Sequence, residues 1–331
     1  MKKICKWLLK AVVAGFAAFL CASCFCYFYY NLPAHQAVTS CATDYAWSAN
    51  HISMRGTEGF AYTKTDENGY VNTFPIKKDT TDILLMGSSH TEGFNVNYNQ
   101  NYAYLLNQKL YDAGTDLYAY NIGMSSHTFG VCLNNLEDAI VAFCPTKYVV
   151  IETYADDVSM QLMKQMLNDT YKPEATKNSG LVYQLQKLDF ARLVYSQLKN
   201  LSNNQTSASS KKTLPEQYGT YLDQVIEKAG NIASSYDCTL IILYSPRLSV
   251  DYFGNVITPE ASEQLTLLES ACEKYGVVFI NAQSSYEAMY NETKHLPQGF
   301  VNTAVGAGHI NQYGHACIAD ILFDYITEEG R

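Results

Sequence analysis

Short apolar runs recur along the chain and stop abruptly at small polar residues. In the stretch DILLMGSS, residues 82–89, four apolar side chains lead directly into Gly87, Ser88 and Ser89. A run of four to six apolar residues that ends in turn formers is typical of a central parallel strand, buried on both faces. The same pattern predicts five strands in all, over residues 82–87, 117–122, 147–152, 239–244 and 276–281.

Segments between these strands repeat apolar residues at spacings of three and four positions, which predicts amphipathic helices. Such segments cover residues 129–143, 181–199, 215–236 and 261–275. Strands that alternate with helices predict an α/β fold: a three-layer α/β/α sandwich around a mainly parallel five-stranded sheet, over residues 81–330. We expect the long connection 153–238 to be a helical insertion, in which the polar stretch 201–212 is a surface loop.

The segment ahead of the first strand reads differently. Residues 31–58 show neither the three-to-four-residue repeat of a helix nor the alternation of a strand, and this absence predicts an irregular stalk. Residues 59–75 alternate apolar and polar side chains around the turn formers Asp66 to Gly69, a pattern that predicts a β-hairpin. We therefore assign residues 31–80 to a stalk and a hairpin.

The amino terminus predicts a membrane anchor. Residues 1–10 carry four lysines and no acid, and residues 11–30 carry no charge at all. As a helix, the uncharged segment is about 30 Å long, enough to cross a bilayer, and the lysines place the amino terminus in the cytoplasm. Residues 1–30 are thus a predicted cytoplasmic tail and signal-anchor helix of a single-pass cell-membrane protein, with all later residues outside the cytoplasm. The alternatives are a cleaved signal peptide, which would give a secreted domain, and a lipoprotein site at Cys24.

Composition and charge exclude a nucleic-acid-binding role. With 32 acidic and 23 basic residues the chain has a net charge of −9, whereas nucleic acid requires a basic face. The 47% of apolar residues among 331 are enough to bury a full core. None of the six cysteines beyond residue 30 has CxxC spacing, and no Cys/His cluster has zinc-site spacing. The sequence therefore implies no metal and no organic cofactor, and it leaves one disulfide open.

The first predicted strand ends in a motif that can place a nucleophile. Residues 87–93 read G-x-S-x-T-x-G, with Ser89 at the centre. In open α/β sheets, ligands bind at the carboxyl ends of the strands, and a serine in a tight turn there keeps its backbone N–H free for an oxyanion. Ser89 is therefore a candidate nucleophile, although glycine and serine are also ordinary turn formers after a strand.

A histidine near the other end of the chain can supply the base. His309 lies in GHINQYGH, just ahead of a predicted helix that Asn311 can cap. If the first strand and the last helix are neighbours, His309 reaches Ser89 across the carboxyl edge of the sheet and takes its proton. The alternative is that His309 only caps or packs, which is the commoner role of a single histidine.

Together these motifs resemble the SGNH/GDSL family of serine esterases and O-acyltransferases, over roughly residues 80–328. In that family the nucleophilic serine lies in G-D-S-x-T-x-G, and here Ser88 replaces the aspartate. Gly123 in YNIGMSS matches the glycine after the second strand, and H-I-N-x-x-G-H matches the last block. The resemblance implies the flavodoxin-like SGNH fold, Ser89 as nucleophile, His309 as base, and an oxyanion hole formed by the N–H groups of Ser89 and Gly123.

Two of the family's residues are missing. The stretch VVIETYADD after the third strand has no asparagine, so Thr153 or Tyr154 would have to replace the side-chain donor of the oxyanion hole. Gly306 stands three residues before His309, where the family carries the aspartate that orients the histidine. A backbone carbonyl, or an acid from elsewhere such as the aspartate pair 156–157, would have to act instead. We therefore predict a Ser-His dyad.

The resemblance also suggests a substrate. Membrane-anchored members outside the cytoplasm are similar to enzymes that add or remove O-acetyl groups on cell-surface polysaccharides, some beside a membrane acyltransferase. We expect hydrolysis of O-acyl esters of surface glycans, acetyl above all, with acyl transfer by the same residues or another ester substrate as alternatives. His90, Tyr154 and Arg247 are the predicted pocket residues. A rival from another class is a catalytically inactive SGNH-like subunit that binds or assembles glycans, which the retained Ser89 and His309 oppose.

Overall fold

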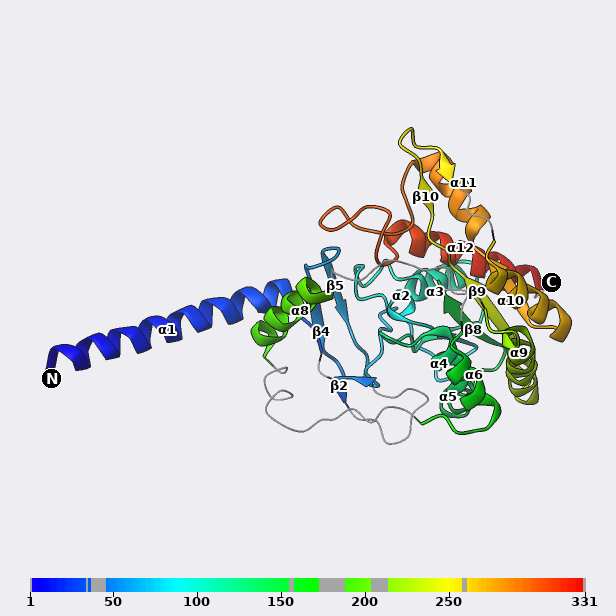
Figure 1. Cartoon of the computed structure of the whole chain (residues 1–331), viewed down its shortest axis with the longest axis horizontal. Coiled ribbons are helices and arrows are strands. Elements are labelled where there is room, and N and C mark those ends of the chain that lie inside the picture. The colour runs from blue at the N-terminus through cyan, green and yellow to red at the C-terminus, as the bar shows by residue number, and fades with distance from the viewer. Residues whose placement is uncertain are drawn as a thin grey trace.

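A long N-terminal helix projects from an α/β domain in the computed structural model of the chain (Figure 1). This helix, α1, spans Lys2–Tyr29. The structure describes residues 2–33, 35–36, 46–154, 158–172, 188–203, 214–257 and 261–329. Most of the predicted loop 201–212, and the aspartate pair 156–157, lie outside these ranges.

Five parallel strands form the central sheet, as the apolar runs predicted. In chain order they are β6 (Ile83–Met86), β7 (Ala119–Asn121), β8 (Tyr148–Thr153), β9 (Thr239–Tyr244) and β12 (Val278–Asn281). Their order across the sheet is β12-β9-β8-β6-β7, and every neighbouring pair is parallel. The chain passes from one side of β6 to the other between β7 and β8, which creates the switch point at which open α/β sheets bind ligands.

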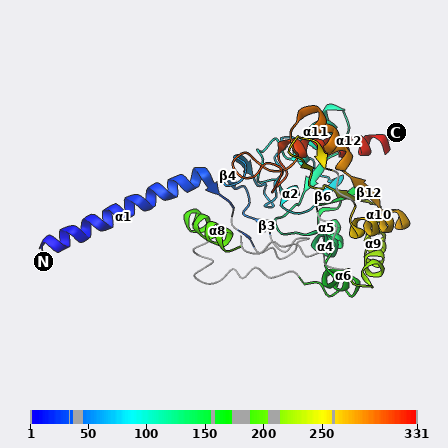
Figure 2. The ribbon, with the colours of Figure 1, turned by 45° about the horizontal axis from the view of Figure 1, so that its top comes forward.

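Helices cover both faces of the sheet, which confirms the predicted three layers. Alternate residues of a strand point to opposite faces. Ile83 and Leu85 of β6 accordingly pack in one core, and Leu84 and Met86 in the other. One face carries α3 (Tyr102–Asp112), α11 (Gln283–Thr293) and α12 (Gln312–Glu329). The other, lower in Figure 2, carries α4 (Phe129–Asn134), α5 (Leu136–Phe143), α6 (Met160–Leu167), α9 (Tyr218–Ser235) and α10 (Glu263–Tyr275).

The connection between β8 and β9 contains α6, α8 (Asp189–Asn203) and α9. Helix α9 belongs to the layer on the sheet, because Leu222 and Val225 are buried in the same core as Val149 of β8. Helix α8 leaves the layers and lies beside the end of α1 (Figures 1 and 2). The predicted insertion is thus partly a crossover helix of the sandwich and partly a separate element near the N-terminal helix.

A small antiparallel sheet joins α1 to the domain. It consists of β1 (Tyr30–Asn31), β4 (Ile52–Arg55) and β5 (Ala61–Lys64), in the order β1-β4-β5. Part of the predicted stalk is therefore strand, and the predicted hairpin around Asp66 is wrong, since the hairpin turn is formed by residues 56–60. Asp66 Oδ1 accepts the N–H groups of Asn68 and Tyr70, each at 2.9 Å, which closes a local turn instead.

Two further pairs of short strands lie outside these sheets. They are β2 (His35–Gln36) with β3 (Ala46–Trp47), and β10 (Ser249–Val250) with β11 (Val256–Ile257). The β10–β11 hairpin stands out at the top of the domain in Figure 1, away from α8. Its turn carries two exposed aromatic residues, Tyr252 and Phe253.

Candidate active site

Ser89 projects from the turn that follows β6. It is the first residue of α2 (Ser89–Glu92), and the Ser88 side chain caps this helix by accepting the N–H of His90 at 3.4 Å. Gly87 leaves no room for a side chain, because a Cβ would lie 2.0 Å from Thr91 Oγ1. The first N–H of a helix has no acceptor within that helix. The N–H of Ser89 is therefore available to an oxyanion.

The last loop of the domain brings His309 against Ser89. Nε2 of His309 lies 2.9 Å from Oγ of Ser89, although 220 residues separate them in the sequence. Asn311 caps α12 as predicted, because its Oδ1 accepts the N–H groups of Tyr313 and Gly314 at 3.0 and 3.3 Å. The structure thus joins the two candidate residues that the sequence placed at opposite ends of the domain.

A third residue, Glu58, completes a hydrogen-bonded chain. The Nδ1–H of His309 donates to Glu58 Oε2 at 2.6 Å, and the backbone N–H of His309 donates to Glu58 Oε1 at 2.8 Å. Because Nδ1 carries the proton that faces the carboxylate, Nε2 is left as an acceptor for the Ser89 hydroxyl. The arrangement is that of a serine, histidine and acid triad, where the sequence predicted a dyad.

Glu58 was not recognised from the sequence, for two reasons. It lies in the 56–60 turn between β4 and β5, which the misplaced hairpin assigned to the stalk. It also stands 251 residues before His309, and no spacing motif joins residues so far apart. The available signal was the run G-T-E-G, residues 56–59, in which two glycines flank an acid as in a tight turn.

Two asparagines fix the turn that carries Glu58. Asn302 Nδ2 donates to the carbonyls of Gly56 and Gly59 at 2.8 and 3.0 Å, and Asn302 Oδ1 accepts the N–H of Gly59 at 3.0 Å. Asn95 Nδ2 donates to the carbonyl of Glu58 at 3.2 Å. The turn is thus bonded both to the loop before α12 and to the segment after α2, the two elements that carry the base and the serine.

The charges at the site favour a neutral base at neutral pH. Burial alone would raise the pKa of Glu58, but the hydrogen bonds and charge of His309, with the charge of Arg55, lower it to about 2. The pKa of His309 falls below 6.5, because burial outweighs its interactions with Glu58. His309 must be unprotonated to accept the serine proton. We therefore expect ester turnover to rise with pH through a pKa below 6.5 and to be level near pH 7, in a pH–rate profile on a soluble ester.

Gly308 leaves the space that Glu58 occupies. Its φ is +95°, and a Cβ at this position would lie 2.3 Å from Glu58 Oε1. We expect Gly308→Ala to displace the carboxylate and to lower kcat on p-nitrophenyl acetate about 10²-fold. Gly114→Ala is the matched control, because Gly114 also has a positive φ, +69°, but has open space where its Cβ would be. Wild-type kcat in a folded Gly308→Ala variant would contradict this reading.

Gly123 has a different environment from the one predicted. Its N–H donates to Asn121 Oδ1 at 2.8 Å, so this donor is already occupied. A Cβ on Gly123 would lie 2.5 Å from the backbone nitrogen of Glu92 and 2.6 Å from Thr91 Cβ. Gly123 therefore lets the loop after β7 pack closely on α2, and its geometry gives no support to a role as oxyanion donor.

The turn after Gly123 offers another donor. The backbone N–H groups of Met124, Ser125 and His127 each donate to an acceptor 2.9 to 3.1 Å away. Ser126 is the one residue of this turn whose N–H has no acceptor within the described part of the chain. Its φ is +71°, a strained conformation for a residue with a side chain.

A cavity of about 350 Å³ opens beside Ser88. Thr153 and Tyr154, at the end of β8, line it together with the apolar side chains of Phe129 and Leu162. Thr153, predicted for the oxyanion hole, and Tyr154, predicted for the pocket, therefore lie next to the turn that carries Ser88 and Ser89.

The other two predicted pocket residues have supporting positions. The ring of His90 packs between Tyr154 and His309, with ring centroids 4.5 and 5.6 Å away, and His90 Nδ1 lies 3.6 Å from Glu152 Oε1. Arg247 Nε donates to the carbonyl of Gly306 at 2.6 Å. His90 thus packs against the base, and Arg247 holds the loop that carries it.

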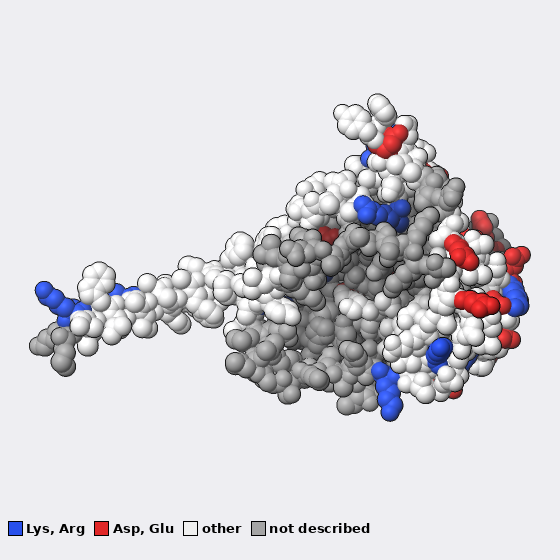
Figure 3. Space-filling model, viewed as in Figure 1, with Lys and Arg blue, Asp and Glu red and all other residues white. Residues whose placement is uncertain are grey.

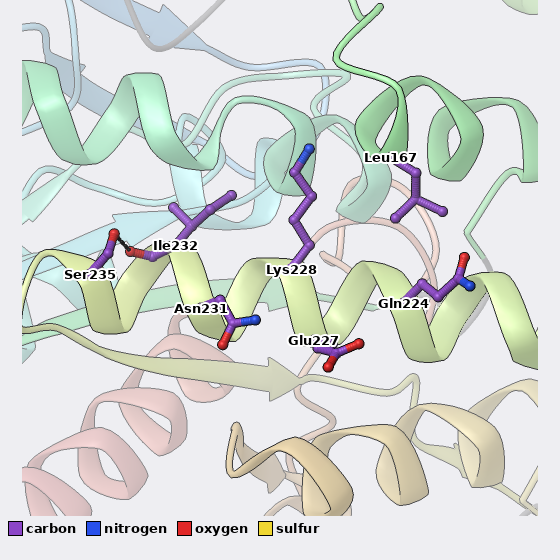
Figure 4. A pocket seen from close by; sticks show the side chains of 7 residues that line it. All are labelled: Leu167, Gln224, Glu227, Lys228, Asn231, Ile232 and Ser235. Carbon is purple, nitrogen blue, oxygen red and sulfur yellow. Dashed lines mark hydrogen bonds between the residues drawn. The ribbon is translucent and has the colours of Figure 1, made fainter.

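A second cavity, of about 460 Å³, lies along α9 and the end of α6 (Figure 4). Its lining consists of Leu167, Gln224, Glu227, Lys228, Asn231, Ile232 and Ser235. Lys228 is paired there with Asp169 at 2.6 Å. The lining contains none of the residues that the sequence singled out, so the cavity beside Ser88 is the candidate substrate site.

His315 is a buried histidine with a structural role. The described ranges contain no group of three or more His, Cys, Asp or Glu side chains that could hold a metal ion. His315, at the end of H-I-N-x-x-G-H, accepts the backbone N–H of Tyr102 at 3.3 Å through Nδ1. Burial lowers the pKa of His315 to about 3. His315 is therefore neutral at neutral pH.

Comparison with known proteins finds distant likenesses only. No protein-family model and no curated protein sequence matches the chain. Among solved structures, a psychrotrophic esterase EstA from Pseudoalteromonas sp. is similar at 14% identity, with a TM-score of 0.42, over 76% of this chain and 98% of that one. A lipase/acylhydrolase from Enterococcus faecalis is 15% identical, with a TM-score of 0.42, over 76% and 97% of the two chains. The acetyl xylan esterase AlAXEase is 13% identical, with a TM-score of 0.40, over 74% and 98%.

These TM-scores lie below 0.5 and the identities below 25%. No conclusion about the activity of this chain follows from them. The functional interpretation rests instead on the chain itself. It depends on the order of the strands and on the contacts of Ser89, His309 and Glu58.

Proposed function

We propose that the chain is a serine esterase of the SGNH type, with Ser89 as nucleophile, His309 as base and Glu58 as the acid that orients the base. The observation that carries this proposal is the continuous hydrogen-bonded chain from Ser89 Oγ through His309 to Glu58, with bonds of 2.9 and 2.6 Å. The motif resemblance around Gly87 to Gly93 and His309 to His315 supports it from the sequence.

In the proposed reaction His309 Nε2 takes the proton of Ser89 while Oγ attacks the ester carbonyl carbon. The N–H groups of Ser89 and Ser126 hold the resulting oxyanion, in place of the predicted Ser89 and Gly123 pair. The imidazolium, stabilised by ionised Glu58, gives its proton to the leaving alcohol, and an acyl-enzyme remains. Water attacks this ester with His309 again as base, which releases the acid and restores Ser89.

The proposed substrate is an O-acetyl or other short O-acyl ester of a cell-surface glycan. The apolar side chains of Phe129 and Leu162 in the cavity suit a short acyl chain, and the exposed ring of Tyr154 offers a surface on which a sugar can stack. A sugar hydroxyl in place of water would give acyl transfer with the same residues. A membrane acyltransferase that supplies the acyl group is the partner that this second outcome would require.

The proposed location is outside the cytoplasm, with α1 as a membrane anchor. The segment Lys3–Tyr29 contains an 18-residue stretch with a mean hydropathy of 2.1, which is apolar enough to span a bilayer, and its lysines lie at the amino end. A signal sequence has the same features. Mass spectrometry of the mature protein from membranes separates the two, because an anchored chain keeps residues 1–30.

The function is tested by acetate release from an O-acetylated polysaccharide, compared with turnover of p-nitrophenyl esters of increasing chain length. We expect release by the wild type, loss of it in His309→Ala, and a preference for acetyl over longer esters. If the chain is instead a binding subunit, neither the wild type nor His309→Ala should turn over any ester, and both should bind the polysaccharide.

A further inference from the structure

The turn that carries Glu58 is bonded directly to the end of α1. The N–H of Gly56 donates to the carbonyl of Tyr29 at 2.7 Å. The Tyr29 ring covers Gly56, since a Cβ there would lie 2.5 Å from the ring, and it lies 6.4 Å from the ring of Phe60. Glu58 follows Gly56 by two residues, which span at most about 7 Å. The acid that orients His309 therefore lies within about 10 Å of the end of the proposed membrane helix.

Apolar side chains are exposed around the same end of the domain. Helix α8 lies beside the end of α1 (Figures 1 and 2), and Phe190, Val194 and Leu198 follow one another on it at four-residue spacing. Leu198 is 61% exposed, and Phe60 in the 56–60 turn is 69% exposed. Exposed apolar side chains thus lie on two elements that adjoin the end of α1: helix α8, and the turn that holds the catalytic acid.

The opposite face of α8 is tied to the domain. Arg192 donates to the carbonyls of Leu32 and Pro33, directly after β1, with the second bond at 3.2 Å. Position 192 lies about 160° around the helix from both Phe190 and Val194. The exposed apolar face therefore points away from the residues that tether α8. Figure 3 shows charged side chains at the amino end of α1, and white side chains along the rest of this helix up to the domain.

We infer that the apolar face of α8 and Phe60 rest on the outer surface of the bilayer, so that Ser89 acts at the lipid–water boundary on esters carried by membrane-anchored molecules. A lipid surface is the occupant because α1, a helix of bilayer length, leaves the domain beside α8. An amphipathic helix with an apolar face lies in the plane of such an interface. The inference rests on the proposed anchor and esterase activity, and it narrows the substrate to esters that are held at the membrane.

The position of α8 is tested without catalysis by a tryptophan scan of the full-length protein in phosphatidylcholine vesicles. Phe190→Trp adds a fluorophore on α8, and Phe253→Trp makes the same change on the β10–β11 turn, where the side chain is 85% exposed. With lipids brominated on their acyl chains, we expect the fluorescence gained in Phe190→Trp to be quenched and that gained in Phe253→Trp to persist. Trp7 and Trp47 give the background in both. Equal quenching in the two variants, or none, overturns the inference.

Catalysis gives a second readout. In the same vesicles, Val194→Asp with Leu198→Asp is expected to lower kcat/KM about tenfold for an acetate ester on the glycerol hydroxyl of a phosphatidylglycerol headgroup, with p-nitrophenyl acetate turnover unchanged. Tyr252→Asp with Phe253→Asp is the matched control and should change neither rate. Equal losses on both esters, or no loss on either, contradict a membrane-borne substrate. If the wild type hydrolyses neither ester, the esterase proposal fails, and the quenching result alone decides where α8 lies.

Discussion

Replacing Ser89 with alanine is expected to lower kcat for p-nitrophenyl acetate by about 10⁴- to 10⁶-fold, because the variant has no nucleophile and keeps only the oxyanion donors and binding contacts. The fold should persist, since Oγ of Ser89 bonds to His309 and not to the core. Steady-state turnover with a thermal melt of each protein measures both effects.

A distant serine provides the control for this variant. Ser262 caps α10 by accepting the N–H of Leu265 at 3.1 Å. We expect Ser262→Ala to lose about 1 kcal/mol of unfolding free energy with full activity. Activity in Ser89→Ala within tenfold of the wild type would remove Ser89 from the mechanism.

Replacing Glu58 with glutamine is the second change with a large expected effect, a loss of about 10² to 10⁴ in kcat. The amide keeps the shape of the side chain but no longer stabilises the imidazolium, and its NH₂ group can hold the wrong tautomer of His309. Without the carboxylate that raises it, the pKa of His309 should fall further. The acid limb of the pH–rate profile should therefore move to lower pH, a shift that a merely structural residue would not cause.

Glu67→Gln is the matched control for Glu58, because Glu67 lies in the next turn and is paired with Lys77 at the surface at 2.5 Å. It should change neither kcat nor the pH profile. A Glu58→Gln variant with a normal kcat would show that the Ser89–His309 pair works without its acid.

Most of the fold could be predicted from the sequence, because the patterns that mark strands and helices are local. Each parallel strand is a short apolar run with its own ends, so 83–86 and 148–153 could be recognised without knowledge of their neighbours. Ser89 and His309 were found in the same way, since each stands at the end of a local pattern. Their contact at 2.9 Å also depends on the first strand and the last helix being neighbours, which the alternation of strands and helices does not by itself establish.

Glu58 and Ser126 could not be found in this way. Glu58 reaches His309 only because a hairpin near the N-terminal helix folds back across the carboxyl edge of the sheet, and that hairpin has weak alternation and short strands. The second donor was predicted at Gly123 because that glycine matches the family's motif after the second strand. Which N–H is free depends on the side chain of Asn121, two residues away, whose orientation no periodicity reveals.

The most direct test of an activated serine is labelling of the full-length protein with a fluorophosphonate, with the modified residue located by peptide mass spectrometry. The account predicts a single adduct on Ser89, absent in Ser89→Ala and formed at least about 10²-fold more slowly in Glu58→Gln and His309→Ala. No adduct on the folded protein, an adduct on another serine, or an unchanged rate in both variants would contradict it.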